Sequence, residues 1–106
     1  MKKNRVCISI CSRGFSNNLS NLLKSIYKNS FNKNLKISVL IIFNQSKKIK
    51  EFQRKIIQKN LKNIVYKIFY EKKIGISYAR NKSLTSLKKI DYEYCCFIDD
   101  DCIIEK

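Results

Sequence analysis

The feature that most constrains the fold of this chain is an alternation of two sequence patterns. Short, largely apolar runs rich in Ile, Val, Phe and Tyr lie at 6–11, 37–43, 64–70 and 94–98. Between them lie segments in which apolar residues recur every three or four positions, the spacing of one face of a helix. We therefore predict the element order βαβαβαβ.

The three helical segments differ in how clearly they are marked. In the first, Ser16 is placed to cap the helix start, and the apolar series is Phe15, Leu19, Leu22, Leu23, Ile26 and Tyr27. In the second, the series is Ile49, Phe52, Ile56 and Ile57. The third is predicted over 77–87, with a buried face made of Ala79, Ser83, Leu84 and Leu87.

Alternating strands and helices indicate parallel strands joined by right-handed crossovers, with helices on both faces of the sheet. Strands covered on both faces are apolar throughout instead of alternating, as these runs are. We predict an α/β, Rossmann-like fold with a mostly parallel sheet. A length of 106 residues allows one domain, 1–106.

Charge composition suggests an anionic partner but does not identify one. The chain has 23 Lys and Arg against 8 Asp and Glu, a formal net charge of +15, and no His. The Lys residues are scattered over every predicted element, so we predict no specific nucleic-acid role, although weak salt-sensitive adhesion is expected. Without His, a Ser-His-Asp triad and imidazole metal ligands are excluded, and carboxylates must carry any metal chemistry.

The cysteines and the apolar runs bear on location. The five Cys residues contain no C-x-x-C pair, which argues against a zinc site or a disulfide framework, so we predict that they are small buried apolar residues. The apolar runs are much shorter than the roughly 18 residues of a membrane span. We therefore predict no transmembrane segment and a cytoplasmic location.

Ligands of parallel α/β sheets bind beyond the carboxyl ends of the strands. The chain has polar residues there, at 11–14, 44–46, 71–75 and 99–101. Three of its four Asp are consecutive at 99–101, and two carboxylates in a D-x-D spacing can reach one hard divalent ion. Arg80 follows a Gly-containing loop, where a guanidinium can hold a phosphate. An acidic turn and an exposed helical Arg are the alternative interpretations of the two features.

Three motifs together resemble a known family. They are VCISICSR at 6–13, EKKIGISYARN at 71–81 and FIDDD at 97–101. In this order and spacing the chain is similar to the nucleotide-binding half of family 2 glycosyltransferases, which have the GT-A fold. The resemblance covers nearly the whole chain but only the amino-terminal part of such enzymes, so we expect the acceptor-binding half to be absent.

The resemblance implies a pocket for a nucleoside diphosphate sugar, linked to UDP or GDP, as the glycosyl donor. Cys11 and Arg13 would contact the nucleoside, and Arg80 the base or the phosphates. Asp99 would lie near the ribose or the metal, and Asp101 would ligate the Mn²⁺ or Mg²⁺ that bridges the diphosphate. Asn44 stands where the family commonly has an acidic residue that binds the base, and it can still form hydrogen bonds there.

The reaction implied is inverting transfer of the glycosyl unit to a hydroxyl of a glycan or a lipid-linked acceptor, at the inner membrane face. Inverting members carry their carboxylate general base farther toward the carboxyl terminus. We therefore assign no catalytic residue, and whether this chain is an enzyme by itself stays open.

Other interpretations are kept as alternatives. The chain could be a non-catalytic folded remnant, or a partner-binding module of a glycosyltransferase. It could be a basic nucleic-acid-binding protein, or a phosphotransferase or hydrolase of the haloacid dehalogenase type, in which a D-x-D follows a strand. A sheet that ends after its fourth strand also exposes an edge, so we expect self-association.

Overall fold

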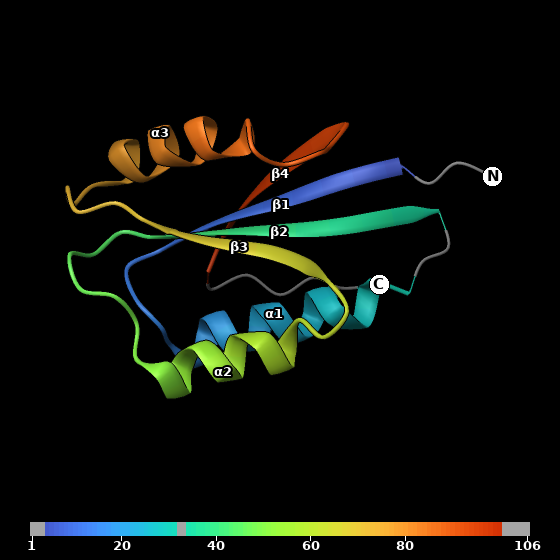
Figure 1. Ribbon diagram of the computed structural model, residues 1–106, viewed down its shortest axis with the longest axis horizontal. Helices are drawn as coiled ribbons and strands as arrows, with labels where there is room; N and C mark the ends of the chain where they lie inside the picture. Colours follow the sequence, from blue (N-terminus) through green and yellow to red (C-terminus); the bar gives the residue numbers. More distant parts are fainter. Residues whose placement is uncertain (1–3, 32–33, 101–106) are drawn as a thin grey trace.

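The predicted order of strands and helices is confirmed in the computed structural model, which describes residues 4–31 and 34–100 (Figure 1). The elements are β1 (Asn4–Ser12), α1 (Asn17–Asn29), β2 (Leu35–Phe43), α2 (Glu51–Asn60), β3 (Val65–Tyr70), α3 (Ile76–Leu87) and β4 (Tyr94–Asp99). The observed bounds differ from the predicted ones mainly in that β1 and β2 each begin earlier in the chain.

The four strands form one sheet in the order β3-β2-β1-β4, and every neighbouring pair is parallel. Helices α1 and α2 cover one face and α3 covers the other (Figure 1). The fold is therefore α/β and Rossmann-like, as predicted. The chain adds strands in one direction from β1 to β3 and then crosses back to place β4 on the other side of β1. This reversal creates a topological switch point at the carboxyl ends of β1 and β4.

Helix α1 forms as its sequence predicts. The Ser16 side chain accepts a hydrogen bond from the backbone N–H of Leu19 at 3.2 Å, which satisfies a donor that the first turn leaves free. Four apolar side chains of the helix are fully buried, namely Leu19, Leu22, Leu23 and Ile26. Together with residues of β1, β2 and α2 they form the larger of the two cores.

Helix α2 departs from the prediction at Phe52, whose side chain is 59% exposed. The predicted series began at Ile49, but the helix begins at Glu51, so helical spacing does not extend back to Ile49. Ile57 is the residue of α2 that is fully buried, and Ile49 is buried from the loop that precedes the helix. Phe52 therefore faces away from the core.

Helix α3 departs from the prediction at Leu84, which is 56% exposed. The residues buried against the sheet are Ala79, Ser83, Ser86 and Leu87. Successive residues of a helix are about 100° apart, so Leu84 cannot share the face of Ser83 when Ala79 and Leu87 define it. The buried face of α3 is consequently made of smaller and more polar residues than that of α1.

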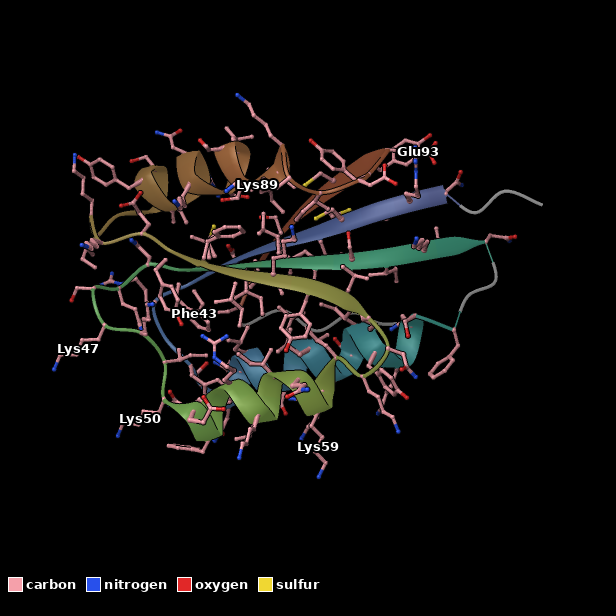
Figure 2. The ribbon with its side chains drawn as sticks, viewed as in Figure 1. Phe43, Lys47, Lys50, Lys59, Lys89 and Glu93 are labelled. Atoms are coloured by element: carbon pink, nitrogen blue, oxygen red, sulfur yellow. The ribbon has the colours of Figure 1, made fainter. Side chains whose placement is uncertain are left out.

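Strand β4 does not meet the expectation that apolar strands are covered on both faces. Tyr94 is 60% exposed and Phe97 is 49% exposed. In contrast, the last five residues of β2 are buried, and Phe43 stacks on the ring of Tyr70 with centroids 5.8 Å apart, between the sheet and α1 and α2 (Figure 2). Within residues 4–31 and 34–100, β4 is the last strand of the sheet and has a strand neighbour on one side only.

The prediction of buried cysteines is correct for Cys7 and wrong for Cys96, which is exposed; Cys102 lies outside the described residues. Cys11 and Cys95 are half-buried. Burial raises the pKa of the Cys7 and Cys11 thiols and raises the pKa of Cys95 to about 11. Among the described residues there is no helix with the length and apolar character needed to cross a membrane.

Candidate functional site

The predicted site residues of β1, α3 and β4 lie together at the switch point. Cys11 and Asp99 are register partners on the adjacent strands β1 and β4. Both side chains line two adjoining hollows, of about 360 Å³ and about 230 Å³, which share Ile76 as a further wall. Arg13 and Asn44 line the larger hollow, and Arg80 lines the smaller one. Four of the strand and helix ends named from the sequence thus converge on one place.

A hydrogen bond joins Ser12 and Asp100, which both line the larger hollow. The buried Ser12 hydroxyl lies 2.8 Å from Oδ2 of Asp100 and 2.6 Å from the carbonyl oxygen of Gly14, and it accepts from the Gly14 N–H at 3.2 Å. It therefore ties the end of β1 to the acidic turn after β4. Because Oδ2 of Asp100 is held by Ser12, Asp99 is the less constrained of the two carboxylates.

Asn44 is buried and its amide organises the loop between β3 and α3. Its Nδ2 donates to the carbonyl oxygens of Glu71 at 3.0 Å and Lys73 at 2.7 Å. Its Oδ1 accepts from the backbone N–H of Gly75 at 2.9 Å. Both amide N–H bonds are thus engaged within the protein, so the remaining lone pair of Oδ1 is what Asn44 could offer to a ligand.

Gly75 is needed where this loop enters α3. Its φ of 144° lies in the region that L side chains rarely adopt, and an added Cβ would lie 3.2 Å from Cδ2 of Tyr78. The conformation directs the Gly75 N–H to Asn44 and starts α3 beside the larger hollow. A glycine after the polar segment 71–74 is therefore part of how the site is built.

The charged groups around Cys11 have opposite effects on its thiol. Burial raises the pKa of Cys11, the guanidinium of Arg80 lowers it, and the carboxylate of Asp99 raises it further. Arg80 and Asp99, which both line the smaller hollow, thus act on the same thiol with opposite sign. Within residues 4–31 and 34–100, neither side chain takes part in an ion pair, so both are available to a ligand.

The described part of the chain holds no group of three Cys, Asp or Glu side chains gathered for a metal ion. Asp99 lines both hollows, and Asp101, the predicted principal ligand, lies outside the described residues. The donors present are hard carboxylate oxygens, and Mg²⁺ in proteins is commonly bound by one or two carboxylates together with substrate phosphates. These carboxylates therefore fit Mg²⁺ only when a phosphate ligand supplies further oxygen atoms.

Two side-chain pairs of the site were not predicted from the sequence. Ser12 and Asp100 were parts of the strand-end motifs, but their partnership depends on β4 being the neighbour of β1, which the linear order does not state. Ser9 and Ser83 form a buried hydroxyl pair between β1 and α3, and the small side chain of Ser9 leaves space that becomes the smaller hollow. Neither models of known protein families nor curated protein sequences give a match to this chain.

Proposed function

We propose that this domain binds a nucleoside diphosphate sugar, linked to UDP or GDP, as the nucleotide-binding part of a glycosyltransferase of the family 2 type. The observation that carries the proposal is the convergence of Cys11, Arg13, Arg80 and Asp99 on two adjoining hollows at the switch point of a parallel sheet. Open α/β sheets bind their ligands at this place.

The proposed roles are those that the resemblance implies, and the positions of the residues are compatible with them. Arg13 and Cys11 line the larger hollow at the end of β1 and would contact the nucleoside. Arg80 is an exposed cation on α3 and would pair with the diphosphate, since a guanidinium forms paired hydrogen bonds with phosphate oxygens. Asn44 would act mainly by holding the loop from Glu71 to Gly75, with Oδ1 left to accept from the base.

The acidic turn is proposed to bind the donor through a divalent ion. Asp99 and Asp101 would hold Mg²⁺ or Mn²⁺ against the diphosphate, while the Ser12 hydroxyl engages the carboxylate of Asp100. The ion would supply Lewis-acid stabilisation of the charge on the departing nucleoside diphosphate. The net positive charge of the chain favours the approach of this anionic donor.

The reaction that fits this donor is inverting transfer to a hydroxyl of a glycan or lipid-linked acceptor. We place the domain on the cytoplasmic side, at the inner membrane face, where a lipid-linked acceptor would be reached. No residue of this chain is assigned as the catalytic base.

A thermal-unfolding titration with UDP and GDP, each with and without Mn²⁺, tests the proposal. Ligand at about 100 times its dissociation constant stabilises by about 2.7 kcal/mol, which raises Tm by on the order of 10 °C for a domain of this size. We expect a rise that depends on the metal and is strongly reduced in Asp99→Asn and Asp101→Ala. Arg80→Gln should reduce the rise whether or not metal is present.

Glu51→Gln is the matched control, because it also removes one carboxylate but lies at the start of α2, away from the switch point. This variant should keep the full rise. A chain that unfolds cooperatively but shows no rise with either nucleotide would leave the non-catalytic remnant as the better description. An equal loss in Glu51→Gln and Asp99→Asn would show that the loss does not depend on the proposed site, since neither a more positive chain nor a change on α2 should weaken binding of an anion there.

A further inference from the structure

The two free edges of the sheet differ in charge. β3 and β4 are the outermost strands, and among the described residues each pairs with a single neighbour. Six of the eight Asp and Glu residues of the chain fall within 91–106, whereas 22 of the 23 Lys and Arg fall within 1–90. Among the described residues, four acidic side chains lie just before or at the end of β4, at 91, 93, 99 and 100, so this edge is acidic in an otherwise strongly basic molecule.

The β4 edge is also apolar, and no strand of the described residues pairs with it. Its residues 94–98 carry no charge, and Tyr94 and Phe97 are exposed. On the α1 side, a hollow of about 370 Å³ is lined almost entirely by apolar side chains of β1, β2, β4 and α1, among them Ile8, Ile26 and Ile98. In natural proteins Lys, Pro or a bulge usually prevents an edge strand from pairing with another chain. Residues 94–98 contain neither Lys nor Pro.

The β3 edge has the opposite charge. Lys62 precedes the strand, Lys67 lies within it, and Lys72 and Lys73 follow it. Glu71 is the one acidic residue nearby, and its side chain accepts a hydrogen bond from the backbone N–H of Lys73. Val65, at the start of β3, is 63% exposed. This edge is basic at both ends and has an exposed apolar residue between them.

We propose that β4 of one molecule pairs in parallel with β3 of a second copy, so that the sheet continues from copy to copy. In this arrangement the two acidic residues before β4, Asp91 and Glu93, lie beside Lys62 of the second copy. The two after it, Asp99 and Asp100, lie beside the pair of Lys that follows β3. The added strand, with its covering helix, closes the apolar hollow beside Ile98.

Charge selects this pairing over the symmetric ones. An antiparallel pair of β4 strands would place the acidic residues that precede one strand beside those that follow the other. An antiparallel pair of β3 strands would bring Lys62 beside Lys72 and Lys73, and like charges directly across a sheet are destabilising. Glu93 lies beside the start of β1 (Figure 2). Glu93 and Asp91 both form ion pairs with Arg5, so the three side chains together keep a net charge of −1 at that end of the β4 edge.

Repulsion between two molecules of charge +15 opposes association at low salt, but it is screened beyond about 8 Å at 0.15 M ionic strength. Charges that meet at the edges lie closer than that and keep their attraction. Pairing between two different edges is heterologous and does not close on itself. The average molar mass should therefore rise steadily with concentration, without a plateau at the dimer.

Analytical ultracentrifugation of the whole chain at 0.15 M salt tests the proposal with two variants. Cys96→Lys places a charge in the middle of the β4 edge, and Val65→Glu places an acid on the β3 edge. Each variant alone should stay at the monomer mass of 12.6 kDa. An equimolar mixture should rise to twice that mass and stop, because Cys96→Lys keeps an intact β3 edge and Val65→Glu keeps an intact β4 edge.

Phe52→Glu is the control for Val65→Glu, since it also replaces an exposed apolar residue by an acid, on α2 and away from both edges. It should associate as the original chain does. A far-ultraviolet circular dichroism melt checks that each variant folds, and Tyr94→Lys replaces Cys96→Lys if that one does not. The proposal is overturned by a chain that stays monomeric up to its solubility limit, by a Val65→Glu variant that still associates, or by a mixture that remains monomeric.

Discussion

The face of the sheet under α1 and α2 and the face under α3 bury different kinds of side chain. The first encloses twelve buried apolar residues, mostly Leu and Ile, from α1, α2, β1, β2 and the segments on either side of α2. The second encloses five, of which Cys7 and Ala79 are small, and adds the buried hydroxyls of Ser9, Ser83 and Ser86. Tight packing of large side chains stabilises the fold, whereas small side chains bring α3 close and leave the hollows at its margin. The larger apolar core and the candidate site therefore lie on opposite faces of the sheet.

The largest test of this difference is truncation of one buried Leu on each face. Leu22→Ala on α1 should lower the free energy of unfolding by about 2–5 kcal/mol, since the cavity it leaves is enclosed by large side chains. Leu87→Ala on α3 should fall at the lower end of that range, because its neighbours are smaller and fewer. Urea unfolding measures both, with the exposed Leu84→Ala as the control. Equal losses on the two faces would contradict the comparison.

The second prediction concerns Asn44, which joins the sheet to the loop before α3. Asn44→Ala leaves two carbonyl oxygens and the Gly75 N–H without their partner, and an unsatisfied buried polar group costs about 1–3 kcal/mol. We expect a loss of that size in thermal unfolding, together with a smaller rise in Tm on adding nucleotide. Gln45→Ala, whose side chain donates only to the adjacent Lys47 carbonyl, is the matched control and should change neither quantity much.

The third prediction concerns the hydroxyl pair under α3. Ser9→Ala or Ser83→Ala alone leaves one buried hydroxyl unpaired and should cost about 1–3 kcal/mol. The double variant removes both groups and should be less destabilised than the sum of the two single variants, which is the signature of a direct interaction. Strictly additive losses in urea unfolding would show that the two hydroxyls do not support each other.

Much of this architecture could be predicted because it depends on patterns along the chain. The apolar runs and the helical series identified all seven elements and the parallel sheet. Strand ends indicated Cys11, Arg13 and Asp99, and the Gly-containing loop before a helix indicated Arg80. The errors occurred where tertiary packing decides: Phe52 and Leu84 are apolar, yet the phase of each helix turns them outward. The exposure of β4 follows from its edge position, which local periodicity does not report.

Within the site, the hydrogen bonds were the part that could not be predicted. Asn44 was expected to bind a nucleoside base, because residue type and strand end both allow it. Its engagement with Glu71, Lys73 and Gly75 depends on β3 lying beside β2 and on how the next loop returns. The same reason applies to Ser12 and Asp100, since strands β1 and β4 are far apart in the sequence and adjacent in the sheet.

The smallest expected effect is a pH dependence of stability that arises from the thiols of the α3 face. Burial raises the pKa of Cys95 to about 11, whereas an unperturbed thiol has a pKa of about 8.5. A group with a raised folded-state pKa stabilises the fold below its unfolded pKa and loses that contribution as pH rises. The stabilisation from Cys95 is therefore present at pH 7 and declines between about pH 8.5 and 11, and the raised pKa values of Cys7 and Cys11 act in the same direction.

Lysines and tyrosines also titrate at these pH values, so the prediction concerns a difference between two chains. We compare the original chain with Cys95→Ala by thermal unfolding at pH 7, 8.5 and 10. The destabilisation caused by the substitution should shrink as pH rises, because the original thiol must ionise on unfolding while alanine has nothing to ionise. A destabilisation that is independent of pH would mean that Cys95 stabilises the fold only through packing, and that burial on the α3 face does not raise the pKa of its thiol.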